Sequence, residues 1–420
     1  MRDSGVSFGS ISRPTPGHRL EVSRGKHGFL FCAVCFVSRV CSERVCLPMP
    51  PFVIDLKKAE DPRDVVYRTV QALAEGCVVA LPTETDYVVA ASILNHRAVA
   101  ILTELSSCEK DQPKLSLVVK SAEEALDWAP AMSSLGRRLA RRCWPGPVAM
   151  LVNDNHPESL LHQLPHQTQT SIEFMGRLRL RSPTHRMLNE SMRMLVGPVV
   201  LAEPCGDGVA VTIEDLLARA GSQISLAIDD GRTRYAQAES TISISEKDFQ
   251  VVRAGVVSED SLRRLSSVMV LFVCTGNTCR SPMAESLFRM LVSERLHCRP
   301  DELHQRGIIT SSAGISAWGG GKASNGALEA MRNAGADLTG HESQPLTENL
   351  VRQADLIWTM TASHRAAIIA QFPEASDRVS MLSPDRIDVV DPIGGPVSVY
   401  RKCAEQIRGH LEGRIDTLGL

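Results

Sequence analysis

A cysteine and an arginine separated by five residues mark the part of this chain whose chemistry is easiest to infer. Residues 274–281 read Cys-Thr-Gly-Asn-Thr-Cys-Arg-Ser. Cys274 is the candidate nucleophile, because loop amides, a following helix N-terminus and the Arg280 cation all favour the thiolate over the thiol. The same amides, with a guanidinium that can bind two oxygens at once, would hold a phosphate group. The pattern predicts displacement of phosphate from a substrate, with Cys274 and Arg280 as catalytic residues.

The other loop residues fit a cradle for phosphate. Gly276 and Asn277 tolerate the positive φ that a tight loop needs. Ser281 is expected to act twice, as the N-cap of the following helix and as a hydroxyl donor to the Cys274 sulfur when that sulfur leaves. A cysteine and an arginine at this spacing also occur by chance, with the cysteine buried for structural reasons alone. The residues predicted to bind phosphate are Thr275, Gly276, Asn277, Thr278, Cys279 and Ser281.

Two elements must position this loop, and their presence favours the catalytic interpretation. The apolar run 268–273, Val-Met-Val-Leu-Phe-Val, predicts a buried strand that ends at the loop. Residues 282–288, Pro-Met-Ala-Glu-Ser-Leu-Phe, predict a helix that begins directly after it, with proline in its first turn. The order strand, loop, helix places a helix N-terminus behind an anion.

From about Val268 to the C-terminus the chain resembles the low-molecular-weight protein tyrosine phosphatase family. The resemblance implies an α/β domain with a parallel sheet flanked by helices, no cofactor or metal, and a phosphorylated protein as substrate. It also implies that Asp391 is the general acid, which protonates the leaving group and later activates water against the cysteinyl-phosphate. Further motifs stand in that family's order, namely Ser312-Ala313-Gly314, His341 with Ser343, Asp355 to Met360, and Asp391-Pro392.

Two departures from the tyrosine-specific members concern the substrate. Thr278 replaces a bulky aliphatic residue, and Ile393-Gly394-Gly395 follows Asp391-Pro392 where those members have aromatic residues. Both features resemble the bacterial protein-arginine-phosphatase branch, which implies that Thr278 favours phosphoarginine and that Asp391 also faces the guanidinium. Trp318 could restore an aromatic wall for a phenyl ring. Phosphoarginine is therefore favoured over phosphotyrosine, and Thr278 and Trp318 are the expected specificity residues.

The same fold also hosts thiol-coupled arsenate reductases, which need two further cysteines to relay an oxidation into a disulfide. The later cysteines here are Cys298 and Cys403, which are far apart in the sequence. Arsenate reduction is therefore the lesser alternative. Cys279 is close enough to Cys274 along the loop to form a protective disulfide on oxidation.

Length and composition bound the rest of the chain. At 420 residues it exceeds one core, so at least one domain precedes the phosphatase-like segment. A net charge of -2 and an apolar content of 43% exclude a chain that coats nucleic acid or is disordered throughout. No apolar run approaches the roughly 18 residues of a membrane span. A thiolate nucleophile needs reducing surroundings, so we expect a cytoplasmic location.

The first 48 residues are predicted to be an extension, either unstructured or upstream of the true start. An apolar stretch at 28–37 lacks a convincing cleavage site for a signal peptide. No second Cys-x2-Cys pair or spaced histidine pair completes a zinc site with the four cysteines, Cys32, Cys35, Cys41 and Cys46. We predict an extension at 1–48, a first domain at 49–266 and the phosphatase domain at 267–420.

From Asp64 to about Leu265 the chain alternates helical and strand patterns, which predicts an α/β domain. The segment resembles the YrdC-like family of threonylcarbamoyl-adenylate synthases, which join threonine, bicarbonate and ATP for a tRNA modification. The matching motifs are Pro82-Thr83-Glu84-Thr85 with Tyr87, Trp144-Pro145-Gly146-Pro147, Arg181-Ser182-Pro183 with His185, Ser240-Thr241-Ile242 and Arg253-Ala254-Gly255. The resemblance implies a site for ATP, another nucleotide or double-stranded RNA, built from Thr83, Glu84, Thr85, Arg181, Ser240 and Arg253.

Two motifs of that family are damaged. Its Lys-x-Arg element, expected before residue 113, is replaced by Ser-Ser-Cys-Glu-Lys at 106–110. Its Ser-Thr-Ser-Ala-Asn stretch, expected after Val200, reads Leu-Ala-Glu-Pro-Cys at 201–205. Two cations and several hydroxyl donors are lost, and Glu203 adds a carboxylate that repels phosphate. We expect a retained fold with lost or altered synthase activity; an active synthase fused to a phosphatase is the alternative.

Overall fold

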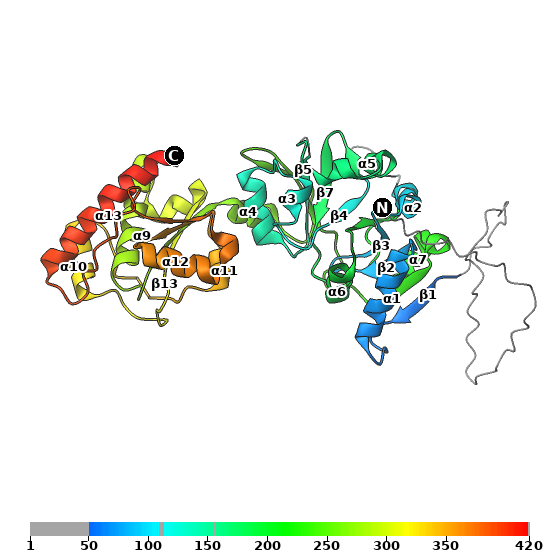
Figure 1. Ribbon diagram of the computed structural model, residues 1–420, viewed down its shortest axis with the longest axis horizontal. Coiled ribbons are helices and arrows are strands. Elements are labelled where there is room, and N and C mark those ends of the chain that lie inside the picture. The colour runs from blue at the N-terminus through cyan, green and yellow to red at the C-terminus, as the bar shows by residue number, and fades with distance from the viewer. Residues whose placement is uncertain (1–49, 107, 109–112, 155, 419–420) are drawn as a thin grey trace, which may run out of the picture. The chain divides into compact units, whose positions relative to one another are not determined.

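The computed structural model describes residues 50–106, 108, 113–154 and 156–418, and Figure 1 labels many of their helices and strands. The predicted extension, with its four cysteines, lies outside the described residues. Among the described residues, no helix combines the length and apolar character needed to cross a membrane. The described strands form two separate sheets, one built before residue 254 and one after residue 267.

The first sheet is mixed, and its strand order is β1-β9-β2-β3-β8-β4-β7-β5-β10-β11, with β6 paired to β7. Strands β2 and β3 are buried along their whole length, because helices cover both faces of this sheet. The strands are β1 (Phe52–Asp55), β2 (Val79–Pro82), β3 (Tyr87–Ser92), β4 (Ser116–Val118), β5 (Val148–Asn153), β6 (Glu173–Phe174), β7 (Arg177–Arg181), β8 (Val199–Ala202), β9 (Leu226–Asp229), β10 (Ser240–Ile244) and β11 (Phe249–Arg253).

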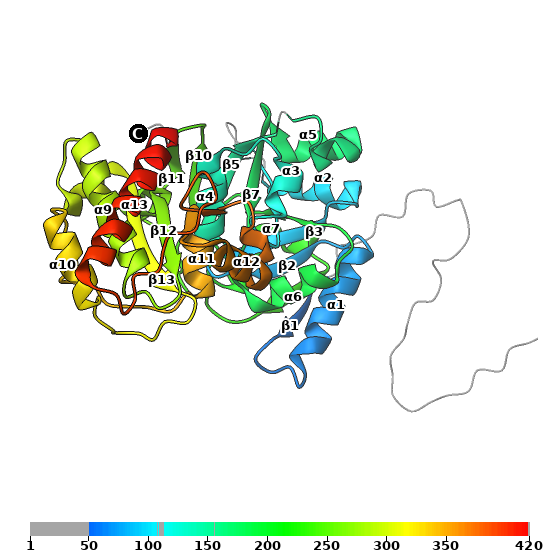
Figure 2. The ribbon, with the colours of Figure 1, turned by 60° about the vertical axis from the view of Figure 1, so that its left-hand side comes forward.

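Two helices of this part, α1 and α6, lie side by side (Figure 2). They share a core with β2, β3, β8 and β9, in which Leu73 and Leu188 are fully buried. A second core includes Leu102, Leu139 and Leu216 from α2, α4 and α7. The helices are α1 (Pro62–Ala74), α2 (His96–Leu105), α3 (Ala125–Trp128), α4 (Ser134–Cys143), α5 (His166–Ile172), α6 (Arg186–Met194), α7 (Ile213–Ala220) and α8 (Glu259–Ser266), with 3-10 turns η1 (Leu160–Gln163) and η2 (Gly221–Gln223).

The second sheet has four strands in the order β13-β12-β14-β15. All of its pairs are parallel, which confirms the predicted parallel sheet. The register sets Cys274 opposite Gly314, so the carboxyl ends of β12 and of the edge strand β13 lie side by side. The strands are β12 (Val268–Cys274), β13 (Ile308–Gly314), β14 (Leu356–Thr359) and β15 (Val379–Met381).

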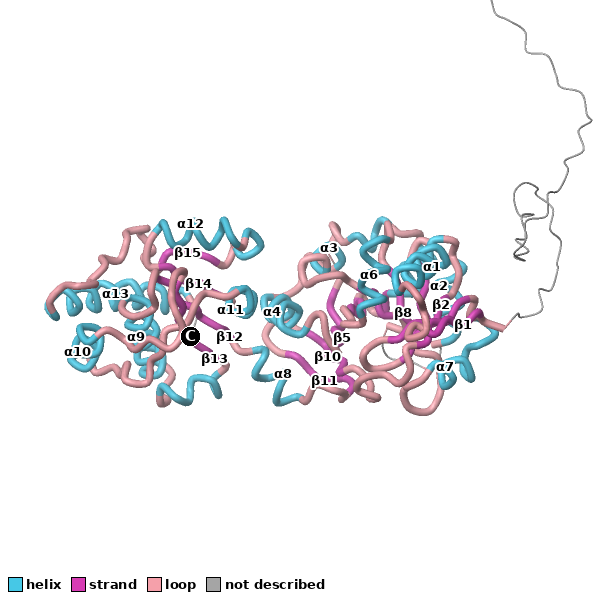
Figure 3. The backbone as a smooth tube through the Cα atoms, turned by 90° about the horizontal axis from the view of Figure 1, so that it is seen from below, coloured by secondary structure: helices cyan, strands magenta, loops and turns pink. Residues whose placement is uncertain are grey.

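Helices flank both faces of this sheet (Figure 3), with α9 and α13 on one side and α11 and α12 on the other. The core under α9 and α13 contains three aromatic rings, Phe272, Phe288 and Trp358, with centroids 5.6 to 5.7 Å apart. The helices are α9 (Arg280–Arg295), α10 (Asn325–Asn333), α11 (Glu348–Gln353), α12 (Ala362–Gln371) and α13 (Val397–Thr417), with 3-10 turns η3 (Pro300–Arg306) and η4 (Pro373–Ala375).

Candidate active site

The loop between β12 and α9 holds the predicted nucleophile. Strand β12 is apolar and almost wholly buried, and Cys274, its last residue, is 3% exposed. Helix α9 begins at Arg280, so its free N-terminal amides face the loop. The fold therefore places the Cys274 thiol where backbone amides and the positive end of a helix dipole converge.

Two donors approach the Cys274 sulfur. The backbone N–H of Asn277 donates to Sγ at 3.2 Å, and the hydroxyl of Ser281 lies 3.0 Å from Sγ. The side-chain amide of Asn277 donates to the Ser281 oxygen at 2.9 Å, and the Ser281 hydroxyl can give its proton to the sulfur or to the Ala313 carbonyl oxygen, which lies 3.4 Å away. Both contacts favour a negatively charged sulfur over a neutral one.

The structure corrects two expectations about this loop. Ser281 is not the N-cap, because α9 begins one residue earlier and Cys279 occupies the cap position without a side-chain bond. The Ser281 hydroxyl is instead taken up by Cys274 and Asn277. The positive φ falls on Asn277 alone, at 54°, and Gly276 is not in the left-handed region. A buried asparagine can adopt this conformation because its side chain bonds locally.

Asn277 is held from outside the loop. His341 Nε2 lies 2.7 Å from the Asn277 carbonyl oxygen, and the Gln344 backbone N–H donates to Asn277 Oδ1 at 2.9 Å. At Gly314, an added Cβ would lie 2.5 Å from the Thr275 carbonyl and 2.9 Å from the Asn277 nitrogen. Only a residue without a side chain lets β13 approach the loop this closely. Sequence reasoning missed Gln344, whose partner lies 67 positions away in the chain.

His364 is a second residue that sequence reasoning missed. Its Nε2 lies 2.9 Å from the Thr275 hydroxyl and its Nδ1 lies 2.9 Å from the Thr361 hydroxyl. Burial, followed by the nearby Arg280 charge, lowers the pKa of His364, so the imidazole is neutral near pH 7. The sequence signal that could have found it is Thr361, three residues earlier. Thr361 is the N-cap of α12 and so fixes the position of His364 in the first turn of that helix.

Arg280 and Asp391 meet beside the loop. Arg280 is 6% exposed and its Nη2 donates to Asp391 Oδ2 at 2.5 Å, while Nη1 lies 3.4 Å from the Val389 carbonyl. The Asp391 side chain is 44% exposed and also accepts a bond from the Ile393 N–H. Asp391 is thus both near the guanidinium and open to a group arriving from solvent.

The remaining predicted residues surround this centre. Thr278 is half-buried, and its carbonyl accepts a bond from the Ser324 N–H at 2.9 Å. The Cys279 sulfur contacts the Ser324 hydroxyl at 3.2 Å and the Tyr400 hydroxyl at 3.8 Å. Trp318 is 89% exposed. Burial raises the pKa of Cys403 to about 12, so this thiol stays protonated at neutral pH.

The first sheet carries a buried cluster in which three arginines meet three carboxylates. Arg181 Nη2 donates to the hydroxyls of Thr83 and Thr85, at 3.1 and 2.6 Å, and pairs with Asp86 at 3.1 Å. The fold therefore brings Thr83, Thr85 and Arg181 together.

Arg253 binds Glu203 through both Nη atoms, at 2.7 and 2.9 Å. Arg179 and Arg253 also reach Glu239, at 2.8 and 2.6 Å. Burial works against ionisation of Glu239, but Arg181, Arg179 and Arg253 together lower its pKa. Burial, then Glu239 and Asp86, raise the pKa of Glu203. Glu239 is thus the carboxylate that stays ionised among the three arginines.

Two predicted residues of the first domain lie elsewhere. The Ser240 hydroxyl bonds the backbone of Val257, donating at 2.8 Å and accepting at 2.9 Å. Glu84 is buried, and its Oε2 accepts a bond from the Thr184 N–H at 2.9 Å. Sequence reasoning missed Glu239. Along β7, Arg177 is exposed while Arg179 and Arg181 are buried. A disulfide joins Cys108 to Cys205, which belong to the two damaged motifs.

Comparison with known proteins finds two families in the chain. A family model described as low molecular weight phosphotyrosine protein phosphatase matches residues 269–419. A model named Sua5_yciO_yrdC and described as telomere recombination matches residues 71–255. These matches confirm both resemblances that the motifs predicted.

Individual relatives agree with this division. The protein-arginine-phosphatase of Bacillus subtilis (strain 168) is 38% identical over 142 residues, which is 33% of this chain and 88% of that protein. A putative threonylcarbamoyl-AMP synthase of Mycobacterium leprae (strain TN) is 28% identical over 191 residues, 45% of this chain and 82% of that protein. A crystal structure of a YwlE mutant from Bacillus subtilis is 36% identical, covers 37% of this chain and 100% of that one, and gives a TM-score of 0.33.

The phosphatase family acts on phosphorylated proteins without a cofactor. The chain belongs to the low-molecular-weight protein tyrosine and arginine phosphatase family and carries a Sua5/YrdC domain ahead of its phosphatase domain.

Proposed function

We propose that this protein removes phosphate from protein side chains through a cysteinyl-phosphate on Cys274, with phosphoarginine as the preferred substrate. The observation that carries the proposal is the buried Cys274 sulfur, approached by the Asn277 N–H and the Ser281 hydroxyl at the start of α9. Hydrogen-bond donors and a helix N-terminus around a sulfur are the surroundings in which cysteines act as nucleophiles.

The first step forms the S–P bond. Cys274 attacks phosphorus while the bond to the leaving nitrogen or oxygen breaks, and Asp391 gives that atom a proton. The loop amides and Arg280 hold the three remaining oxygens. In the second step water attacks phosphorus, Asp391 takes its proton, and the sulfur leaves as a thiolate stabilised by Ser281 and Asn277. Thr275, Gly276, Thr278 and Cys279 would contribute to the same phosphate cradle.

The preference for phosphoarginine rests on the side chains in and around the phosphate loop. Thr278 is half-buried and smaller than the bulky aliphatic residue of tyrosine-specific relatives. Gly394, with a φ of 74°, follows Asp391-Pro392, so this segment offers no aromatic ring. A guanidinium could face the Asp391 carboxylate, whose side chain is 44% exposed. Phosphotyrosine is the second candidate, because Trp318 is exposed and could cover a phenyl ring.

Trapping the intermediate tests this proposal. Asp391→Asn removes the acid of the first step as well as the base of the second, so this variant is mixed with p-nitrophenyl phosphate, whose leaving group needs no proton; rapid quenching should then leave phosphate on Cys274, detectable by intact mass and peptide mapping. Cys274→Ser should trap nothing on that thiol and lose turnover, whereas Cys298→Ser, a matched cysteine change outside the loop, should behave as wild type. Turnover that survives Cys274→Ser would end the proposal.

We also propose that the first domain keeps its fold but no longer makes threonylcarbamoyl-adenylate. The carboxylates of Glu203 and Glu239 already occupy the arginines that would meet phosphate, at 2.6 to 3.3 Å. Arg181 is 1% exposed and engaged with Thr83, Thr85 and Asp86, so it is not presented to solvent. Robust adenylate formation from threonine, bicarbonate and ATP by the full chain would refute this and favour an active synthase.

Four further expectations remain proposals. A nucleotide such as ATP, or double-stranded RNA, stays the expected ligand of the first domain. The bounds proposed for the two domains are 49–266 and 267–420. Arsenate reduction is disfavoured because Cys403, with its pKa near 12, is a poor relay thiolate. A cytoplasmic location is favoured by the Cys274 thiolate, although the Cys108–Cys205 disulfide is uncommon in that compartment.

A further inference from the structure

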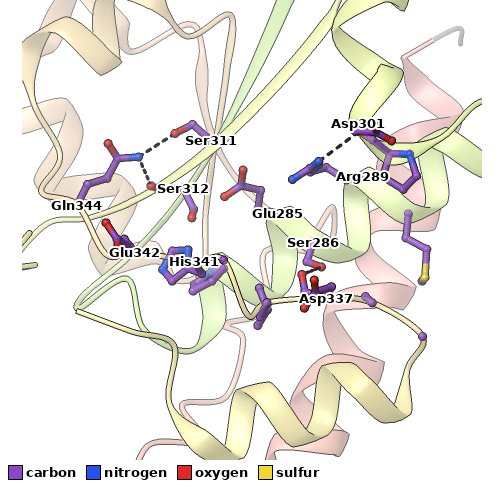
Figure 4. Close-up of a pocket in the computed structure, with 17 residues that line it drawn as sticks. Glu285, Ser286, Arg289, Asp301, Ser311, Ser312, Asp337, His341, Glu342 and Gln344 are labelled. Atoms are coloured by element: carbon purple, nitrogen blue, oxygen red, sulfur yellow. Dashed lines mark hydrogen bonds between the residues drawn. The ribbon is translucent and has the colours of Figure 1, made fainter. Parts of the chain in front are cut away.

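A cavity of about 620 Å³ lies beside α9 and contains no residue of the loop 274–281 (Figure 4). Residues of α9, β13, η3 and the segment 335–344 line it. This volume is in the range of about 300 to 1,000 Å³ that small-molecule sites occupy. The mechanism proposed above makes no use of this space.

Carboxylates dominate the lining. Glu285, Asp301, Asp337 and Glu342 face one permanent cation, Arg289. Three of these carboxylates are exposed and already held, Asp301 by Arg299, Asp337 by Thr339 and Glu342 by Lys322. Glu285 differs, because it is half-buried and accepts a hydrogen bond from the Thr310 hydroxyl at 3.2 Å. Its remaining acceptor capacity is available to a ligand.

A buried hydroxyl provides an independent sign of a ligand. Ser312 lines the cavity and is 2% exposed, and its Oγ has no hydrogen-bond partner among the described residues. Gln344 Nε2 donates to the Ser312 carbonyl at 2.9 Å and to the Ser311 hydroxyl at 3.0 Å, so it does not satisfy Ser312 Oγ (Figure 4). Buried polar groups in native proteins usually have a partner, which here could come from a bound molecule.

We propose that this cavity binds a small organic cation with several N–H donors, a guanidinium or polyamine compound. Glu285 would accept charge-assisted hydrogen bonds from it, and Ser312 Oγ would accept another. Of the exposed carboxylates at the rim, Asp337 is held only by Thr339 groups and adds attraction for a cation. The site is separate from the phosphate loop, although His341 and Gln344 both line the cavity and hold Asn277.

The test is calorimetric titration of the full-length chain with agmatine, with spermidine and with urea as the uncharged control, in saturating inorganic phosphate. At least one cation should bind at one site per chain. Glu285→Gln keeps the shape of the side chain and should weaken binding about tenfold or more, since charge-assisted bonds contribute about 1.5–3 kcal/mol. Glu405→Gln, an exposed change on α13 that does not line the cavity, should leave binding unchanged.

Agmatine binding alone would identify a guanidinium site, and spermidine binding alone a polyamine site. If Glu285→Gln does not fold, as judged by circular dichroism, Ser312→Ala provides the second test and should weaken binding a few-fold. The proposal is overturned if neither cation binds at millimolar concentration, if Glu285→Gln binds as wild type, or if binding requires an empty phosphate loop. The last result would place the cation at Asp391 instead.

Discussion

Gly314→Ala should cripple catalysis while leaving most of the fold intact. The new Cβ would lie 2.5 Å from the Thr275 carbonyl oxygen, 2.7 Å from the Ala317 Cβ and 2.9 Å from the Asn277 nitrogen. Two of these are backbone atoms, which cannot rotate away, so the phosphate loop must shift by several tenths of an ångström or more. Gly314 is not in the left-handed region, so backbone strain does not contribute. Misplacement of reacting groups by about 1 Å can cost about 10²-fold in rate.

We expect kcat on a phosphoarginine peptide to fall by about 10²-fold, with an overpacking cost of about 1–3 kcal/mol in the free energy of unfolding. Rates and urea unfolding measured on the same preparations separate the two effects. Gly409→Ala is the matched control, because it lies within α13 and its Cβ would meet nothing within 4 Å. That control should keep full activity and gain about 0.5–1 kcal/mol of stability. Wild-type kcat in Gly314→Ala would refute the close packing of β13 against the loop.

Three other perturbations follow from the contacts. Arg280→Lys loses the bidentate hydrogen bonds of the guanidinium to phosphate, so kcat should fall about 10²–10³-fold in steady-state assays. An unchanged kcat would show that Arg280 takes no part in catalysis. Burial, and then the nearby Arg280 charge, lower the pKa of His364. The neutral imidazole therefore contributes fully to stability above about pH 6.5, and this contribution is lost as the pH falls through the lowered pKa. Melting temperatures should show this loss, and in His364→Gln they should depend less on pH. Glu239→Gln removes the buried carboxylate that Arg179 and Arg253 share and should cost about 3–5 kcal/mol in urea unfolding, against almost none for the exposed Glu246→Gln. Equal stability of the two variants would contradict a stabilising role for the cluster.

The phosphate loop could be predicted because its signals are local. An apolar run, a glycine and asparagine turn and a helix with proline in its first turn adjoin one another within about twenty residues, so strand, loop and helix follow from propensity and pattern. The role of Ser281 could not be predicted in full, since an N-cap and a sulfur donor compete for one hydroxyl. In the folded loop the Ser281 hydroxyl lies 3.0 Å from the Cys274 sulfur, so packing selects the role of sulfur donor over that of N-cap.

Residues that reach the site from distant segments were harder to predict. Gln344 and His364 touch the loop only because parallel strands bring their carboxyl ends together, a consequence of sheet order and register that the sequence alone does not reveal. In the first domain the sequence pointed to Glu203, which binds Arg253 and Arg179 in the fold; that it repels phosphate stays a prediction. The sequence did not indicate Glu239, which follows a loop and reaches Arg179 and Arg253 only in the folded sheet.

The most direct test of the account is hydrolysis of phosphoarginine, phosphotyrosine and phosphoserine peptides side by side, with Cys274→Ser as the blank and Thr278→Ile as the specificity probe. We predict Cys274-dependent release of phosphate, fastest from phosphoarginine, and a preference that Thr278→Ile shifts toward phosphotyrosine. A preference for phosphotyrosine in the wild type would contradict the substrate assignment. Absence of any Cys274-dependent release would contradict the central claim that this chain is a phosphatase.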